Sequence, residues 1–185
     1  VYGIDITEAF IKIGNHFNKL TEIDHQVKLL KGDGENIPYQ SEFFDGAVSQ
    51  HVTMNIEDRE QFFNEAFRVL KKGAIFGFSE HGLGTKGDPI FPLPWADDEN
   101  MSFLKTPEYT KSLLKKIGFK NIEIISTGEK YISGYNSLLK KGQSNEKPTL
   151  GIHVIGGDSM LERSKNSMRS IIENRTYPFE IICNR

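Results

Sequence analysis

Two acidic residues each close a short segment rich in apolar residues, which places each at the tip of an expected strand. Asp5 ends the first apolar run of the chain and Asp33 ends the second. In open α/β sheets, an acid at a strand tip can accept hydrogen bonds from the paired hydroxyls of a ribose, as Asp5 could. Asp33 suits the exocyclic amine of an adenine, and its glycine neighbours Gly32 and Gly34 allow close backbone approach. The alternative is that each acid only caps a helix or closes a turn.

The elements that would hold these residues alternate along the chain. Apolar periodicity, caps and breakers predict strands and helices in turn. The expected strands are 2–6, 27–33, 43–50, 74–79, 122–126 and 179–183. The expected helices are 7–20, 58–71, 106–117 and 159–173, with a mixed segment at 129–141. This alternation predicts one α/β domain over residues 1–185, with a Rossmann-like, doubly wound and mostly parallel sheet covered by helices on both faces.

A third strand tip is also polar, because Ser49-Gln50-His51 ends the strand expected at 43–50. Three polar tips in succession favour a ligand site at one edge of the sheet over three unrelated turns.

One glycine motif predicts no phosphate site. The run Gly82–Gly87 satisfies the G-x-G-x-x-G pattern and follows an expected strand. That pattern binds phosphate only where a helix begins and directs its backbone amides at the anion. Three prolines lie between positions 88 and 94, and they forbid a helix there. We therefore expect a loop.

The amino-acid composition limits the classes of partner that the chain is expected to bind. The net charge is −2 and the isoelectric point is near 6.2, so nothing electrostatic favours nucleic acid or an anionic membrane. The single cysteine, Cys183, fits a reducing compartment, where a buried and inert thiol is the default. We expect a cytoplasmic protein that binds neither nucleic acid nor membrane. The polar run 140–148 is the best candidate for a linker or a loop.

Several blocks of the sequence resemble the class I S-adenosylmethionine-dependent methyltransferases. These blocks are Gly3–Ile6, Lys31–Tyr39, Phe44–Ile56 and Phe67–Gly73. A finer resemblance is to the glycine, sarcosine and dimethylglycine N-methyltransferases. It is carried by Ser49–Asn55, Phe91–Ala96, Ser102–Leu104 and Leu150–Val154.

The resemblance implies a cofactor, a substrate and their residues. The cofactor would be S-adenosylmethionine, and the substrate a small amine such as sarcosine or dimethylglycine. The implied cofactor-binding residues are Asp5, Ile6, Asp33, Gly34, Glu35 and Gln50. His51 and His81 would orient the substrate or take its proton, and Met54, Asn55 and Trp95 would contact the substrate. The Trp95 ring could cover a methylated ammonium, or it could simply pack its loop on the core.

The chain departs from this family at its beginning. The family's first strand and its glycine-rich loop have no counterpart here, and the family's last strand runs antiparallel. We therefore expect that the edges at Tyr2–Ile6 and Phe44–Ser49 do not pair with each other. An upstream segment of a longer natural protein would fill the space, or a strand exchanged with a second copy in a homodimer. A non-catalytic binding or assembly domain is the alternative to an enzyme.

Overall fold

A computed structural model of the 185-residue chain describes residues 1–142, 157 and 159–185. Its strands are β1 (Tyr2–Asp5), β2 (Lys28–Lys31), β3 (Phe44–Gln50), β4 (Leu70–Leu83), β5 (Lys120–Ser126) and β6 (Thr176–Asn184). Its helices are α1 (Glu8–Leu20), α2 (Arg59–Val69), α3 (Pro107–Ile117), α4 (Gly128–Gly142) and α6 (Met160–Ile172). Two short 3-10 turns, η1 (Thr53–Asn55) and η2 (Glu99–Met101), complete the described elements.

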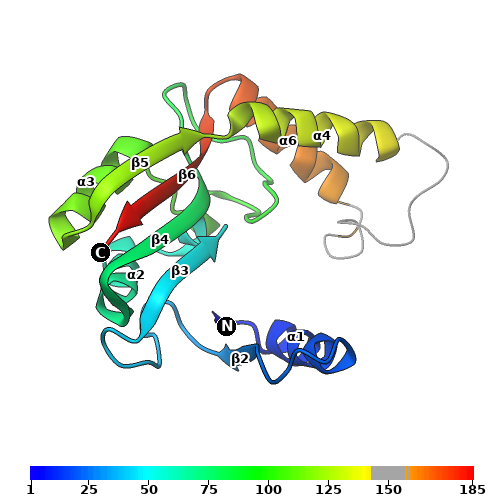
Figure 1. The fold of residues 1–185 in the computed structure, drawn as a ribbon. Coiled ribbons are helices and arrows are strands. Elements are labelled where there is room, and N and C mark those ends of the chain that lie inside the picture. The colour runs from blue at the N-terminus through cyan, green and yellow to red at the C-terminus, as the bar shows by residue number, and fades with distance from the viewer. Residues whose placement is uncertain (143–156, 158) are drawn as a thin grey trace.

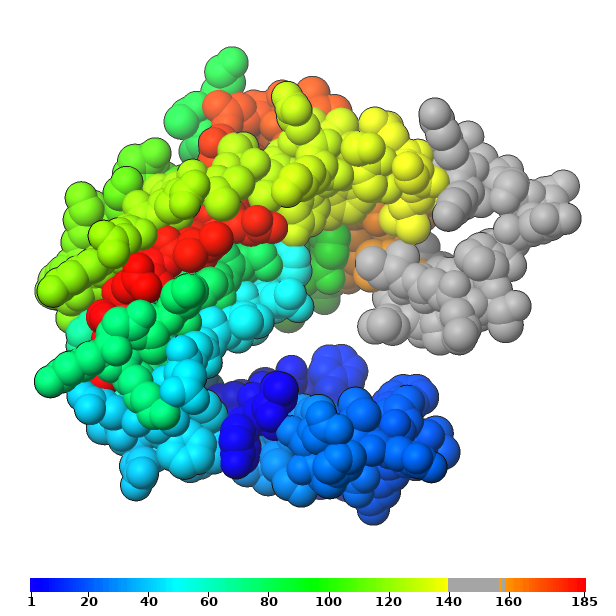
Figure 2. All heavy atoms as spheres, in the orientation of Figure 1, coloured from blue at the N-terminus to red at the C-terminus, as the bar shows by residue number. Residues whose placement is uncertain are grey.

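The strands form two separate ladders (Figure 1). β1 pairs with β2 in parallel, and the four-stranded sheet has the order β3-β4-β6-β5. β3 and β4 are parallel, whereas β6 runs antiparallel to both of its neighbours, as expected for the last strand. β1 and β3 belong to different sheets, so the expectation that these two edges do not pair is confirmed. In Figure 2 the N-terminal segment, in blue, joins the rest of the molecule at one end, and a hollow lies between it and the green part of the molecule elsewhere.

The core lies between the four-stranded sheet and the helices α2 and α3. Phe63 of α2, Leu114 of α3, and Phe76 and Phe179 of the sheet are 2% exposed or less. Side chains alternate between the two faces of a strand, so Ile75 points to the opposite face and is 56% exposed. The sheet therefore presents one buried face and one face with exposed apolar side chains in the described part of the chain.

Several element boundaries differ from the sequence prediction. The second helix was expected to span residues 58–71, but α2 ends at Val69 because Leu70 already has an extended backbone and begins β4. Gly73 lies within that long strand, at φ +78°, which favours glycine. The segment expected to be mixed at 129–141 is helical and forms α4. Most of the linker candidate at 140–148, and the matching block at 150–154, lie outside the described residues.

The glycines of the G-x-G pattern serve close packing. No helix follows them, so the loop prediction is confirmed. A Cβ on Gly84 would approach the carbonyl oxygen of Asn174 to 2.0 Å, and the Gly84 N–H donates to the carbonyl of Arg175. A Cβ on Gly82 would approach the carbonyl oxygen of Lys105 to 2.7 Å. These glycines let three chain segments cross closely, which explains the motif without a phosphate.

Candidate functional site

The two predicted acids lie at neighbouring strand ends. Asp5 is the last residue of β1, and its carbonyl accepts a hydrogen bond from the N–H of Gly32, next to Asp33. One carboxylate oxygen of Asp5 accepts from the N–H of Thr7 at 2.7 Å, and one of Asp33 accepts from Glu35 at 2.9 Å. Both side chains are exposed. Each acid thus closes a turn and still presents a carboxylate to solvent at the same edge.

The other predicted cofactor residues flank these acids or the β3 tip. Ile6 is 70% exposed beside Asp5, and Gln50 is exposed at the end of β3. Partial burial raises the pKa of Glu35, and the nearby carboxylates of Asp33, Asp58 and Glu57 raise it further. This acidic edge would attract hydroxyl and amino donors rather than anions.

Helix α2 holds the loop that follows Asp33. The guanidinium of Arg68 donates to the carbonyls of Tyr39 and Ile37 at 2.6 and 2.9 Å. Glu65 accepts from the N–H of Ile37 at 2.8 Å and pairs with Arg68, which lowers the pKa of Glu65. Gln61 donates to the carbonyl of Glu35 at 2.9 Å. These side-chain bonds join the β1–β2 unit to the body of the domain although no strand ladder does.

Three of the residues expected to face the substrate lie together with one residue that was not predicted. We call His51, His81, Trp95 and Tyr131 the ring cluster. The His81 ring lies 4.6 Å from the Trp95 ring and 4.8 Å from the Tyr131 ring, between centroids. The His51 and His81 rings are 5.8 Å apart, and His51 Nε2 is 2.8 Å from the Tyr131 hydroxyl. The indole N–H of Trp95 donates to Ser102 Oγ at 3.1 Å.

The two histidines differ in their surroundings. His81 is 2% exposed, and burial, with a smaller contribution from the neighbouring His51, lowers its pKa to about 3. Its buried Nδ1 has no hydrogen-bond partner among the described residues. Partial burial also lowers the pKa of His51, opposed by the carboxylate of Glu180. His81 is therefore a neutral interior ring, and His51 is the histidine that a substrate could reach.

Tyr131 belongs to the ring cluster but carries no signal in the sequence. It lies 80 residues from His51, in α4, a segment that matches no motif. Of the predicted substrate contacts, Met54 is 2% exposed and points into the interior. Asn55 is exposed, and its side chain donates to the carbonyl of His51 at 3.4 Å.

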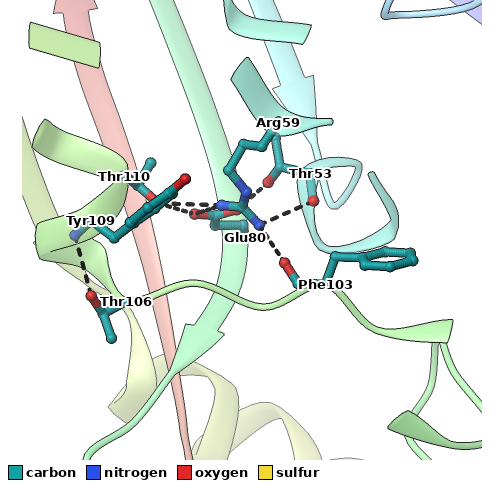
Figure 3. A network of polar contacts seen from close by, with 7 residues as sticks. All are labelled: Thr53, Arg59, Glu80, Phe103, Thr106, Tyr109 and Thr110. Atoms are coloured by element: carbon teal, nitrogen blue, oxygen red, sulfur yellow. Dashed lines mark hydrogen bonds and ion pairs between the residues drawn. The ribbon is translucent and has the colours of Figure 1, made fainter. Parts of the chain in front are cut away.

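The buried ion pair between Arg59 and Glu80 anchors the segment made of residues 51–55 (Figure 3). Arg59 donates to both carboxylate oxygens of Glu80, at 2.9 and 2.7 Å. It also donates to the carbonyls of Thr53 and Phe103, each at 3.1 Å. The Thr53 and Thr110 hydroxyls donate to Glu80 as well. Burial raises the pKa of Glu80, whereas the guanidinium and the two hydroxyls favour its charged form. One network thus fixes η1 to β4 and α3.

Comparisons with known proteins show which families the chain is similar to. Residues 1–78 match the family described as a methyltransferase domain. The chain is 24% identical over 168 residues to the sarcosine/dimethylglycine N-methyltransferase of Halorhodospira halochloris, covering 91% of this chain and 59% of that protein. It is 28% identical over 160 residues to 2-methyl-6-phytyl-1,4-hydroquinone methyltransferase 1 of rice, Oryza sativa subsp. japonica, covering 84% and 44%. The chain thus spans about half the length of these relatives.

A solved structure extends the likeness to the whole fold. It is that of Haemonchus contortus phosphoethanolamine N-methyltransferase 2 with S-adenosyl-L-methionine, at a TM-score of 0.81 and 16% identity, covering 100% of this chain and 43% of that one. The expected Rossmann-like α/β fold is thereby confirmed. Among the described helices, none is both long and apolar enough to span a bilayer.

Proposed function

We propose, on the premise that the chain belongs to the class I methyltransferases, that it transfers a methyl group from S-adenosylmethionine to a small amine such as sarcosine or dimethylglycine. The observation that carries the proposal is that the exposed acids Asp5 and Asp33 and the ring cluster lie near the ends of successive strands. The name of the Halorhodospira relative supports the amine, while the rice relative acts on a hydroquinone by its name.

The cofactor edge fits a nucleoside. S-adenosylmethionine would supply an electrophilic methyl group on its sulfonium. Asp5 is placed to accept hydrogen bonds from ribose hydroxyls, because only one of its carboxylate oxygens is engaged among the described residues. Asp33 is placed in the same way for the adenine amine, on a loop that α2 holds in position. Ile6, Gly34, Glu35 and Gln50 would complete this edge.

The ring cluster suits an amine substrate that must lose a proton before it attacks, because it offers a histidine, His51, that can accept that proton. Methyl transfer is an in-line displacement, so the enzyme chiefly positions the nucleophile and excludes water. The attacking nitrogen must be neutral, and His51 can accept its proton because a lowered pKa keeps the imidazole unprotonated near neutral pH. His81 supports the rings from within. Trp95 would face the substrate with the side of its ring that His81 does not cover.

We expect Asp5→Ala to weaken S-adenosylmethionine binding by roughly 1–3 kcal/mol, because ribose hydroxyls lose a charged acceptor. Asp33→Ala should have a smaller effect in the same direction. Isothermal titration calorimetry on the wild type and both variants measures this. Asp45→Ala is the matched control, because Asp45 is an exposed acid of β3 that pairs with Lys71. Unchanged affinity in both Asp5→Ala and Asp33→Ala would place the nucleoside elsewhere.

We expect Trp95→Ala to lower kcat/KM for the amine by about 2- to 30-fold, the range of a cation–π contact, and to change cofactor affinity less. Ser102→Ala is the control, because it removes the hydrogen bond to the indole and keeps the ring. Methyl transfer to sarcosine and dimethylglycine, followed with radiolabelled cofactor, gives the comparison. Turnover of a quinone or phenol, without turnover of any glycine derivative, would reject the amine assignment.

A non-catalytic binding or assembly domain is the second candidate. The observation that favours it is the separation of β1–β2 from β3, since the cofactor edge then rests on side-chain bonds rather than on a continuous sheet. Calorimetry that detects cofactor binding, together with an absence of methyl transfer to any tested acceptor, would select this candidate.

A further inference from the structure

His51 has a constrained backbone and one constrained ring nitrogen. Its φ is +54°, a left-handed conformation uncommon outside glycine, and its N–H donates to the carbonyl of Ser79 at 2.9 Å. Its Nε2 lies 2.8 Å from the Tyr131 hydroxyl. The backbone therefore fixes the position from which the His51 side chain extends, and the contact with Tyr131 fixes the orientation of the imidazole ring.

The helix that carries Tyr131 is itself held in place. The hydroxyl of Tyr135, one turn further along α4, donates to Ser167 Oγ of α6 at 2.9 Å. Helix α6 also binds the Trp95 loop, because Arg163 donates to the carbonyl of Leu93 at 2.7 Å and Asn166 to that of Pro92 at 3.1 Å. The helices α4 and α6, which lie between β5 and β6, thus fix the positions of both Tyr131 and the loop that carries Trp95.

We propose that Tyr131 is a positioning residue for His51: its hydroxyl oxygen accepts the Nε2–H of the imidazole, which leaves Nδ1 as the proton-accepting nitrogen. This inference rests on the proposed function and deepens it, because it assigns the atom of His51 that serves the acceptor amine. A hydroxyl can fill this role throughout the neutral range, since burial, with smaller contributions from Tyr135 and Glu180, raises the pKa of Tyr131 to about 12.

The charged and titratable groups around His51 come from three elements. His81 of β4 is neutral, and Tyr131 of α4 stays protonated, with Tyr135 next to it. Glu180 of β6 is the acid that raises the pKa of His51 against the effect of burial. A hydrogen bond accepted by Tyr131 stabilises the imidazolium more than the imidazole. Its removal should therefore lower the pKa of His51 further.

The test compares Tyr131→Phe with a control, Tyr109→Phe, at an exposed tyrosine of α3 outside the ring cluster, in the 185-residue chain. Nitrogen-15 NMR of the histidine side chains reports the tautomer and pKa of His51, with His51→Gln to assign the signal. We expect a slowly exchanging Nε2–H in the wild type and in Tyr109→Phe, and its loss in Tyr131→Phe. We expect the pKa of His51 to fall in Tyr131→Phe only. A proton on Nδ1 in the wild type, or a His51 signal unchanged by Tyr131→Phe, overturns the proposal.

Kinetics supply the second readout. In Tyr131→Phe, kcat/KM for the amine should fall by about tenfold, the effect of one hydrogen bond to a charged group, and its acid limb should move to lower pH. If Tyr131 only supported the structure, Tyr131→Phe would lower kcat/KM without shifting the acid limb of its pH profile, and this result would also overturn the proposal. If the wild type transfers no methyl group, the proposed function fails, while the NMR arm still decides the role of Tyr131.

Discussion

Replacing Arg59 by methionine should lower the free energy of unfolding by about 3–5 kcal/mol, because it leaves the carboxylate of Glu80 buried without its cation. The side chains of Arg59 and Glu80 are 2% and 0% exposed, so water cannot substitute for the lost partner. The carbonyls of Thr53 and Phe103 lose their donor as well. Chemical denaturation with urea, followed by circular dichroism, measures the change.

Two further variants separate the ion pair from the mutation itself. Arg169→Met removes an exposed arginine from its pair with Glu173 and should cost less than about 1 kcal/mol, since exposed pairs contribute little. The double variant Arg59→Met with Glu80→Leu removes both buried charges and should recover much of the lost stability. If the single variant Arg59→Met were as stable as the wild type, Glu80 would not be held in the folded protein as a charged carboxylate.

Acid should destabilise the folded chain through His81, by about 4–5 kcal/mol between pH 6.5 and pH 3. The folded-state pKa of His81 is about 3, below the ordinary value of 6.5 that applies when the chain unfolds. The unfolded chain therefore binds the proton first. The contribution is fully present above pH 6.5 and is lost as the pH falls, at about 1.4 kcal/mol per pH unit.

Urea denaturation at a series of pH values from 7 to 4 measures this slope. His81→Phe keeps a flat ring between Trp95 and Tyr131 and should flatten the dependence, even if its stability at pH 7 differs. His25→Gln, at an exposed histidine, is the control for loss of a histidine and should keep the wild-type slope. Equal slopes in the wild type and His81→Phe would show that the His81 ring is protonated within the folded protein.

The sequence predicted elements whose signals are local. Thr106, Pro107 and Gly118 mark the ends of α3 by capping and by breaking, and the structure has that helix with the Thr106 side chain accepting from the N–H of Tyr109. The prediction failed where tertiary contacts decide. Leu70 leaves the helix because β4 pairs it with Phe44 of β3, and nothing near Leu70 in the sequence specifies that partner.

The same distinction applies to the site. The positions of Asp5 and Asp33 at strand ends were predictable, because a strand tip follows from a short apolar run, and their role as cofactor contacts stays a prediction. Tyr131 was not predictable, since its hydroxyl gains meaning only from an imidazole 80 residues away. Arg59 and Glu80 also escaped prediction, because a charged residue in an expected helix or strand reads as a surface residue until its burial is known. Long-range polar contacts are thus the part of a site that residue patterns do not encode.

The separation of the two strand ladders bears on how the molecule opens. Cooperative units of a protein tend to follow its ladders and packed cores, so we expect β1, β2 and α1 to open as a unit apart from the four-stranded sheet. The bonds from Arg68, Glu65 and Gln61 are the polar joints between the units. Fluctuations of the β1–β2 unit would change access to Asp5 and Asp33 and leave the ring cluster intact. A ligand spanning both units would couple them, and protection of the β1 and β2 amides from hydrogen exchange would then depend on that ligand.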